Sequence, residues 1–427
     1  MNQPASNVGT DNILNTYLKR TRKSAEAYQR MQKYVPGGNS RQAGYWNPYP
    51  LSIAKAQGMY LEDVDGNRYL DCLNNYTALV HGHTYEPIVE AVSRQVPRGS
   101  CWAANSESQA DLAQQLVERV DSIDQVRFTN SGTEAGALAL MIARTLTGRK
   151  KILMARYGYH GALMEFEVGY TGKGGPDTCL ATYGDAADFA RVLDEQGEDI
   201  AAVFLEPVLG AGGIVAGSQT FIHEVVNAAR NAGALFVLDE VLTFRLGVGG
   251  RQQALAINPD LTMFGKLIGG GYPVGSVGAS REIMSMFDPA QLKAFHTGTF
   301  NANPITMTAG AVSVRELTAE KINHMEALAI RLKSGLLDAA KTAGLPLSIN
   351  HVGSLLNLFF TDEVVKTVQQ RPDTEIITKF HLAAMNRGLS LASRGLMALS
   401  TVMDENIIDE VIESATNAMT DVKNECR

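Results

Sequence analysis

The residue whose setting best suits covalent chemistry is Lys266, which lies in the segment PDLTMFGKLIGGGYPVG. An apolar run precedes this lysine, and three consecutive glycines follow it closely. An amine in such a setting loses its water, which lowers its pKa and leaves the neutral form free to attack a carbonyl carbon and form a Schiff base. The alternative is a lysine at a strand end that buries its stem and extends its ammonium group to solvent. The residues alone leave both interpretations open.

A second candidate is Asp239, which ends the apolar run of the segment LFVLDEV. A carboxylate at the end of a buried strand is costly unless it has a charged or hydrogen-bonding partner. Ligands of open α/β sheets gather outside the carboxyl ends of the strands, where a protonated pyridine nitrogen would be a suitable partner. The alternatives are a helix N-cap and a structural ion pair.

The segment TNSGTEAGALALMIAR could hold a phosphate group. Ser131, Gly132 and Thr133 precede an apolar helical face, and the first turn of a helix presents free N–H groups to an anion. The same three residues are also typical of ordinary helix capping.

Tyr159 and His160 lie in the segment RYGYHG, and His81 and His83 form a second pair of nearby polar residues. An aromatic side chain after a strand can stack on a flat heteroaromatic ring, although Tyr159 could equally be a core tyrosine. No third metal ligand is visible at a suitable spacing from His81 and His83. We therefore interpret the H-x-H pair as part of a structural turn and expect no metal.

The elements that must position these residues follow an α/β pattern. The runs KKILMAR, DIAAVFLEPV and GALFVLDEV lack alternation, as is typical of strands buried on both faces, and helix-like stretches such as TFIHEVVNAARNAG lie between them. Residues 13–18 predict an N-terminal helix, and residues 58–73 predict a hairpin around Asp65 and Gly66. After residue 316 the pattern becomes α+β. We expect a segment 1–72 that packs with the small domain, a large domain 73–316 and a small domain 317–427.

Composition excludes several classes of protein. The chain has 427 residues, of which 45% are hydrophobic, so two or three packed units are expected. A formal net charge of -7 without a basic block argues against nucleic acid as a partner, and no apolar run is long enough for a membrane span. The polar N-terminus does not look like a secretory signal. Cysteines at 72, 101, 179 and 426 are too scattered for a disulfide scaffold, so we expect a cytoplasmic protein.

The ordered set of motifs resembles the class III aminotransferases of fold type I, which use pyridoxal 5'-phosphate (PLP). SGTEA, YHG, the EP of LEPV, LDEV, FGKLIGGG and GTFNANP occur in the expected order between about residues 35 and 425. The resemblance implies an α/β fold, with a mostly parallel seven-stranded sheet in the large domain and a small α+β domain. It also implies a homodimer with shared active sites.

The resemblance assigns roles to individual residues. Lys266 would carry the cofactor as a Schiff base, and Asp239 would pair with its pyridine nitrogen. The other implied cofactor contacts are the phosphate-binding segment Ser131, Gly132 and Thr133, the stacking Tyr159, Glu206 near the ring hydroxyl, Val241 on the opposite ring face, and Thr299 at the phosphate of the neighbouring subunit.

Two subfamilies share features with the chain. PGGNSR, the three glycines after Lys266 and PVG are similar to glutamate-1-semialdehyde aminomutases, but Ala211 and Gly212 stand where those enzymes typically have an asparagine. NNYTALVHGH, LEPVLGAGG and RGLMALST are more similar to β-amino acid aminotransferases of the β-phenylalanine type. We therefore expect transfer of the amino group of an aromatic β-amino acid to a 2-oxo acid such as 2-oxoglutarate or pyruvate.

In that subfamily interpretation, Arg41 and Arg394 are the candidate carboxylate binders, because the planar fork of arginine matches a carboxylate. We expect Arg41 to bind the β-amino acid and Arg394 to bind the acceptor. The alternative for each is a surface or capping arginine. A catalytically silent PLP-fold binding protein is a further alternative, against which the presence of both Lys266 and Asp239 argues.

Overall fold

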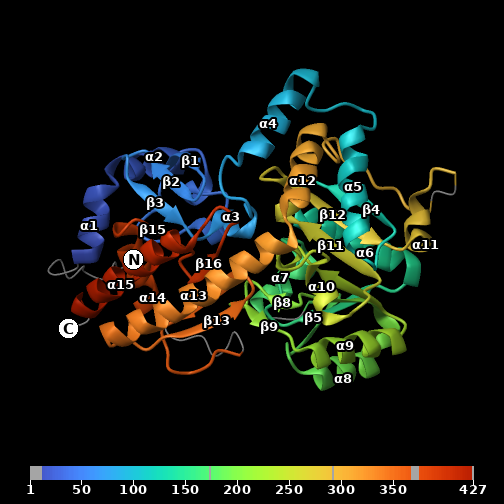
Figure 1. Ribbon diagram of the computed structural model, residues 1–427. Coiled ribbons are helices and arrows are strands. Elements are labelled where there is room, and N and C mark those ends of the chain that lie inside the picture. Colours follow the sequence, from blue (N-terminus) through green and yellow to red (C-terminus); the bar gives the residue numbers. More distant parts are fainter. Residues whose placement is uncertain (1–11, 173–174, 291–292, 367–374, 426–427) are drawn as a thin grey trace.

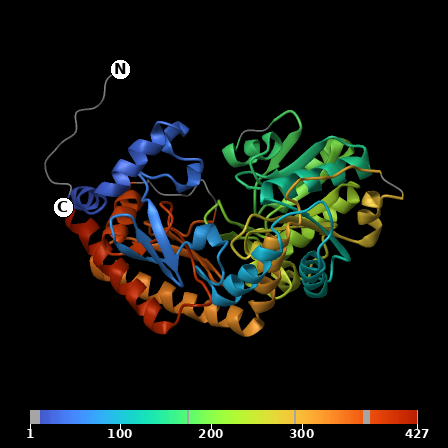
Figure 2. The same ribbon diagram turned by 90° about the horizontal axis from the view of Figure 1, so that it is seen from above.

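The computed structural model describes residues 12–172, 175–290, 293–366 and 375–425. Figure 1 shows that the N-terminal and C-terminal elements lie together on one side of the molecule, and that the central part of the chain forms the other side. The same separation is visible from above in Figure 2. Cys426 and the first eleven residues lie outside the described residues.

A seven-stranded sheet forms the centre of the larger side, in the order β4-β12-β11-β10-β7-β5-β6. Only β12 runs antiparallel to its neighbours among these strands, which confirms the predicted mostly parallel sheet. All six residues of β7 are buried, as expected for a run of apolar residues without alternation. The strands are β4 (Gln125–Thr129), β5 (Lys151–Ala155), β6 (Thr178–Ala181), β7 (Ile200–Leu205), β10 (Leu235–Asp239), β11 (Leu261–Gly265) and β12 (Gly275–Ala279).

Helices cover both faces of this sheet. The apolar side of α6 (Gly132–Thr147) packs against one set of strand side chains, and α8 (Ala186–Gln196) and α9 (Gln219–Asn231) pack against the alternate set. The remaining helices of this side are α4 (Glu86–Gln95), α5 (Glu107–Arg119), α7 (Met164–Thr171), α10 (Gly250–Leu255), α11 (Arg281–Met284) and α12 (Pro304–Glu316), with a small hairpin of β8 (Val208–Leu209) and β9 (Val215–Ala216).

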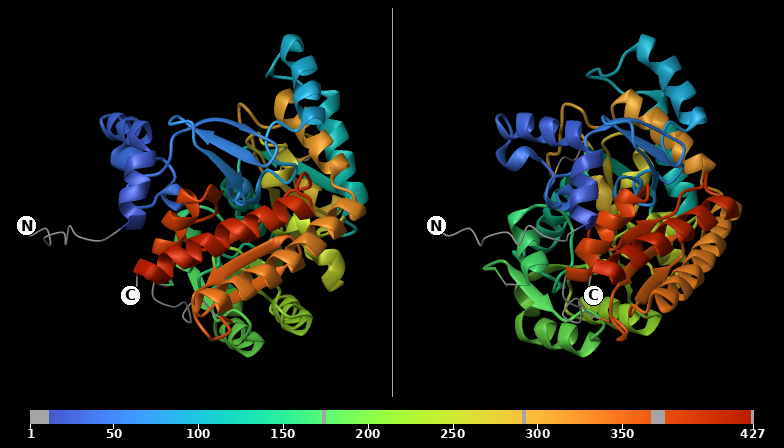
Figure 3. Two further views of the ribbon diagram at one scale, coloured as in Figure 1. Left: turned by 60° about the vertical axis from the view of Figure 1, so that its left-hand side comes forward. Right: turned by 90° about the vertical axis from the view of Figure 1, so that its left-hand side faces the viewer.

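The smaller side combines both ends of the chain. The predicted hairpin is confirmed as antiparallel β2 (Tyr60–Asp63) and β3 (Arg68–Asp71), and β3 pairs in parallel with β15 (Leu389–Ser390). One apolar cluster joins Ile13 and Tyr17 of α1 (Asn12–Arg20) to the helices near the C-terminus. Figure 3 shows two of these helices, α13 (Ala319–Ala343) and α15 (Glu405–Glu425), running side by side.

The other elements of this side are the remaining strands of two small sheets and the remaining helices. They are α2 (Arg22–Gln32), β1 (Ile53–Gln57), α3 (Asn74–Thr77), β13 (Ser348–Val352), β14 (Leu355–Phe359), α14 (Glu375–Asn386) and β16 (Leu396–Ala398). The domain limits at 72/73 and 316/317 stay predictions. Among the residues that the structure describes, no helix has both the length and the apolar character needed to cross a membrane.

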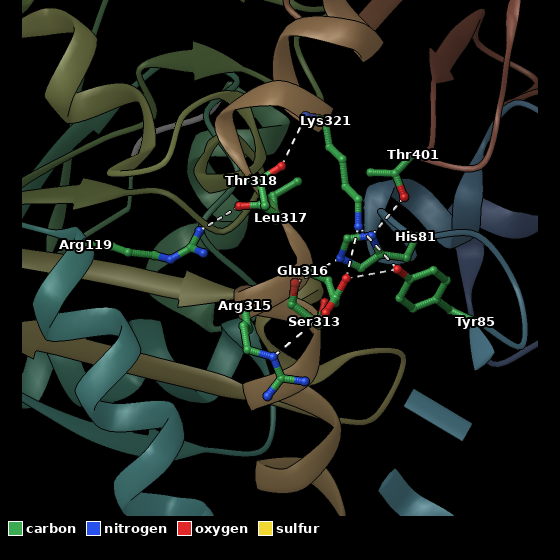
Figure 4. A network of polar contacts seen from close by, with 10 residues as sticks. All are labelled: His81, Tyr85, Arg119, Ser313, Arg315, Glu316, Leu317, Thr318, Lys321 and Thr401. Atoms are coloured by element: carbon green, nitrogen blue, oxygen red, sulfur yellow. Dashed lines mark hydrogen bonds and ion pairs between the residues drawn. The ribbon is translucent and has the colours of Figure 1, made fainter. Parts of the chain in front are cut away.

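A polar network lies where α12 gives way to α13, close to the predicted limit at residue 316 (Figure 4). The ring of His81 contacts Ser313 O through Nε2 and Thr401 Oγ1 through Nδ1, each at 2.9 Å. Burial lowers the pKa of His81 to about 4, so the ring is neutral at physiological pH. His83 turns instead to Asp71, 2.7 Å from its Nε2. The two histidines of the H-x-H pair thus serve different structural contacts.

Candidate active site

A cavity of ≈ 680 Å³ lies at the carboxyl ends of neighbouring strands of the large sheet. Tyr159 follows β5, Glu206 follows β7, Asp239 ends β10 and Lys266 follows β11, and these strands are adjacent in the sheet. All of these residues line the cavity. The parallel sheet therefore brings together chemistry-bearing residues that lie far apart in the sequence.

Lys266 begins the short helix η6 (Lys266–Gly269) with a φ of 50°, a left-handed conformation that is uncommon for a residue with a side chain. Such local strain clusters at functional sites. Burial lowers the pKa of Lys266, and the carboxylates of Asp239 and Glu206 partly oppose that shift. Gly270 in the following turn has a φ of 58°, and a Cβ there would lie 2.5 Å from Ala309 O. Gly270 thus allows α12 to pack directly against the turn.

Asp239 is buried at the end of β10, with 5% of its surface exposed. Its Oδ1 accepts a hydrogen bond from Val241 N at 2.9 Å, and its Oδ2 lies 2.8 Å from His160 Nδ1. The side chain of His160 is fully buried between Phe166 and Phe204, and its Nε2 has no hydrogen-bond partner within the described residues. His160 therefore orients the carboxylate of Asp239 toward the cavity.

The first turn of α6 contributes Ser131, Gly132 and Thr133 to the cavity wall. Ser131 Oγ caps the helix by accepting a hydrogen bond from Glu134 N at 3.1 Å, so the capping interpretation holds for its side chain. The Thr133 hydroxyl accepts from Ala162 N at 3.2 Å. A Cβ on Gly132 would lie 3.3 Å from a methyl group of Val241, so this glycine keeps the helix N-terminus close to that side chain. The free N–H groups at this helix N-terminus are suited to bind an anion.

Tyr159 is 46% exposed and lines the cavity, so it is not a core tyrosine. Its backbone N–H donates to Glu206 Oε1 at 2.9 Å, and the N–H of Gly210 donates to Glu206 Oε2 at 3.0 Å. Burial raises the pKa of Glu206 to about 7, against the lowering effect of His160. The two N–H donors fix the carboxyl group beside the aromatic side chain.

A left-handed turn at α3 forms another part of the wall. Residues 74–77 have φ angles of 50°, 51°, 54° and 74°. Left-handed conformations cost roughly 1–2 kcal/mol per residue with a side chain, although asparagine tolerates them better. From this turn, Asn75 Oδ1 accepts a hydrogen bond from Arg41 Nη1 at 2.8 Å, and the Arg41 guanidinium lies 5.6 Å from the centre of the Tyr76 ring. Asn75 and Arg41 both line the cavity.

Two predicted site residues lie outside this cavity lining. Arg394 is in the turn before β16, where Ala392 N donates to Leu396 O at 3.1 Å and Gly395 N donates to Ala392 O at 2.8 Å. Arg394 is not among the residues that line the cavity. Thr299 is exposed, and its carbonyl oxygen accepts from Cys101 Sγ at 3.4 Å.

Sequence reasoning missed Asn75 and the role of His160. The histidine stands beside Tyr159 in the YHG motif, but its partner Asp239 is 79 residues away, so only the sheet order reveals the contact. The two consecutive asparagines of NNYT were an available signal for left-handed backbone.

A family model described as Aminotransferase class-III matches residues 42–175 and 177–422. The chain belongs to this family. Among similar proteins, glutamate-1-semialdehyde 2,1-aminomutase of Rhodopirellula baltica is 35% identical over 421 residues, which cover 93% of this chain and 96% of that protein. β-Phenylalanine transaminase of Variovorax paradoxus is 34% identical over 395 residues, which cover 91% of each protein. The crystal structure of an omega-transaminase from Sphaerobacter thermophilus is 33% identical, with a TM-score of 0.91, and covers 96% of this chain and 99% of that one.

This class III aminotransferase is a PLP-dependent enzyme of fold type I, as the sequence motifs predicted. The donor set of the cavity fits the cofactor. It combines an amine with a lowered pKa, a buried carboxylate suited to a protonated ring nitrogen, a helix N-terminus suited to phosphate and an exposed aromatic side chain. Family membership and this donor set do not support a silent binding protein.

Proposed function

We propose that this enzyme transfers the amino group of an aromatic β-amino acid, similar to β-phenylalanine, to a 2-oxo acid such as 2-oxoglutarate or pyruvate. The observation that carries the proposal is Arg41, which lines the same cavity as Lys266 and is held by Asn75 Oδ1. Among the described lining residues, Arg41 and Lys266 are the cations, and Leu242, Val241 and Ala211 add apolar surface. A guanidinium beside apolar surface suits a substrate that carries both a carboxylate and an aryl group.

When bound, PLP supplies an electron sink for the carbon that bears the substrate nitrogen. Lys266 is the residue we expect to hold the cofactor covalently and, once its Nζ is free, to remove and return a proton at the substrate carbon. Its lowered pKa increases the neutral fraction that such a base requires.

The other residues of the cavity would hold the cofactor in place. Asp239, oriented by His160, would keep a proton on the ring nitrogen. Gly132 and Thr133 would hold the phosphate, Tyr159 and Val241 would flank the ring, and Glu206 would lie near the ring hydroxyl.

Two carboxylate binders would resolve a geometric conflict. The carboxylate of a β-amino acid lies one carbon further from the reacting nitrogen than that of a 2-oxo acid, so one fixed arginine would misplace one of the substrates. We assign Arg41 to the β-amino acid and Arg394 to the acceptor, which requires Arg394 to reach the cavity from the turn before β16.

Aminomutase activity is the second candidate, and the relative from Rhodopirellula baltica favours it. Against it, Ala211 places a methyl side chain at the cavity wall, next to Gly210, whose N–H donates to Glu206 Oε2. The mutases that the chain resembles typically have an asparagine in this segment. A mutase moves nitrogen within one molecule, whereas a transaminase needs an acceptor. Incubation with β-phenylalanine and 2-oxoglutarate or pyruvate should therefore yield glutamate or alanine, and neither product above the enzyme-free level would contradict transamination of this substrate.

Single-turnover kinetics of each half-reaction test the arginine assignments. Loss of a charge-assisted bidentate contact costs roughly 1.5–3 kcal/mol, or about ten- to a hundred-fold in kcat/KM. Arg41→Ala should slow the β-amino acid half-reaction by that factor, and Arg394→Ala should slow the acceptor half-reaction. The amine 1-phenylethylamine, which lacks a carboxylate, is the control substrate and should be nearly insensitive to Arg41→Ala. If neither variant slows either half-reaction by more than about two-fold, the arginines are structural.

The enzyme is further proposed to be a homodimer in which Thr299 contributes to the phosphate site of the neighbouring subunit. Two observations support this assignment: Thr299 is exposed, and it lies outside the cavity lining of its own chain. Large exposed apolar side chains also lie near it, with Phe300 61% exposed and Trp102, next to Cys101, 41% exposed.

A further inference from the structure

Arg245 is a fully buried arginine in η5 (Thr243–Leu246), the short helix that follows the loop carrying Asp239 and Val241. Its Nε donates to Ser354 Oγ at 3.1 Å and its Nη1 donates to Thr77 O at 3.2 Å. Its Nη2 donates to the carbonyl oxygen of Leu399 and lies 3.8 Å from Met325 Sδ. Within the described part of the chain, no carboxylate forms an ion pair with it.

A buried cation that is satisfied by neutral groups alone is costly, and an apolar side chain of similar volume often packs as well. Burial lowers the pKa of Arg245 to about 9, so the guanidinium stays charged at neutral pH. The hydrogen bonds of its guanidinium group therefore indicate which parts of the structure Arg245 stabilises. They join three parts of the molecule: the loop after β10, the left-handed turn 74–77, and the sheet β13-β14-β16, where Ser354 precedes β14 and Leu399 follows β16.

The left-handed turn has an inner and an outer side. On the inner side, Thr77 O accepts from Arg245, and Asn74 Nδ2 donates to Ala398 O at 2.6 Å. On the outer side, Asn75 holds the Arg41 guanidinium, and the Tyr76 hydroxyl donates to the carbonyl oxygen of Ala43. A strained turn keeps one conformation only when its surroundings over-determine it, and Arg245 supplies one of the inner contacts.

We propose that Arg245 is a positioning residue for substrate binding: it fixes the turn 74–77 against the sheet β13-β14-β16 and the loop after β10, and so holds Arg41 where a substrate carboxylate binds. The inference rests on the proposed function, in which Arg41 is the carboxylate binder. It deepens that function by naming the residue that preorganises the binder.

The charge of Arg245 gives a second, independent readout. This charge contributes to the lowered pKa of Lys266, after the larger effect of burial. Removing the charge should raise the pKa of Lys266, because a nearby positive charge disfavours the protonated amine. The same charge acts on the Lys266 nitrogen when it is bonded to the cofactor, so the pH at which the absorbance of the bound cofactor changes should move upward in Arg245→Met and move less in Arg245→Lys.

The test measures equilibrium binding of 3-phenylpropanoate to the holoenzyme by calorimetry. This probe has the aryl group and the carboxylate of the proposed substrate but no amine, so no reaction occurs. The variants are Arg245→Met, Arg245→Lys, Arg41→Ala and the double variant Arg245→Met with Arg41→Ala. The matched control is Arg149→Met, because Arg149 donates to the carbonyl oxygens of Gly197, Ile200 and Ala232 at the opposite end of the sheet.

We expect Arg245→Met to weaken binding of the probe by about ten-fold or more, and the double variant to bind no more weakly than Arg41→Ala alone. Arg149→Met should stay within about two-fold of the wild type. If Arg41→Ala weakens binding but Arg245→Met does not, Arg245 has no positioning role. If Arg41→Ala itself has no effect, the carboxylate assignment of the proposed function fails instead. Should Arg245→Met not fold, Arg245→Lys and Asn74→Ala test the same link by the same measurement, and wild-type affinity in both would overturn the inference.

Discussion

At the scale of single residues, two carboxylates and two cations line the same cavity. Asp239 and Glu206 are buried, and burial shifts the pKa of Glu206 upward and that of Lys266 downward. Opposed shifts of this kind are typical of sites that move protons near neutral pH. The sequence settings of Asp239 and Lys266 predicted these two residues directly, whereas Glu206 was implied only by the resemblance to the family. The sequence could not predict that His160 contacts Asp239, since that contact depends on the order of strands in the sheet.

Glu206 should make the stability of the apoenzyme depend on pH. Its pKa rises from an ordinary 4.5 to about 7, so its contribution is fully present below pH 4.5 and is lost as the pH rises through 7. Between pH 5 and 8 the wild type should therefore lose up to about 3 kcal/mol of unfolding free energy relative to Glu206→Gln. Urea unfolding across this pH range measures the difference, with the exposed Glu198→Gln as control. Parallel pH profiles for the wild type and Glu206→Gln would contradict the assignment.

At the scale of elements, α6 packs closely against the loop after β5, which carries His160. A Cβ on Gly136 of α6 would lie 2.8 Å from His160 O and 2.7 Å from Phe166 Cε2. The sequence predicted α6 from its apolar face and β5, β7 and β10 from their apolar runs, since both patterns are local. It did not predict the left-handed turn 74–77, because long-range contacts such as that of Asn74 with Ala398 hold it.

Gly136→Ala separates the two effects that act at this position. Alanine favours a helix interior over glycine by about 1 kcal/mol, so propensity alone predicts stabilisation. Overpacking against a backbone carbonyl typically costs about 1–3 kcal/mol, so we expect a net loss of stability. Thermal unfolding of the holoenzyme measures the sign. A higher Tm in the variant would show that the contact between α6 and the His160 loop can relax freely.

At the scale of the whole molecule, the cavity lies on the large sheet but is walled by segments held by the small sheets. The turn 74–77 and Arg41 reach it from the N-terminal part of the chain, and Arg245 links that part to the loop after β10. The mostly parallel sheet was predictable from the sequence. The burial of Arg245 was not, because nothing local in LTFRLG distinguishes it from a surface arginine.

The proposed homodimer gives Thr299 a role that its own chain does not show. Sedimentation should find a particle of about twice the 46.1 kDa chain mass. Thr299→Ala should weaken PLP retention by about ten-fold, because it removes one hydrogen bond to a charged phosphate. Thr342→Ala, at an exposed helix position, is the control. An active monomer, or unchanged PLP retention in Thr299→Ala, would contradict the shared site.

The function proposed for this enzyme depends most directly on Lys266, which we expect to carry the cofactor. Borohydride reduction of the holoenzyme fixes the cofactor to the amine that bears it, and peptide mapping by mass spectrometry then identifies that residue. We predict a single reduced cofactor adduct on Lys266, in the peptide that contains FGKLIGGG, and no adduct in Lys266→Ala. An adduct on another lysine, or full activity in Lys266→Ala, would contradict this role of Lys266.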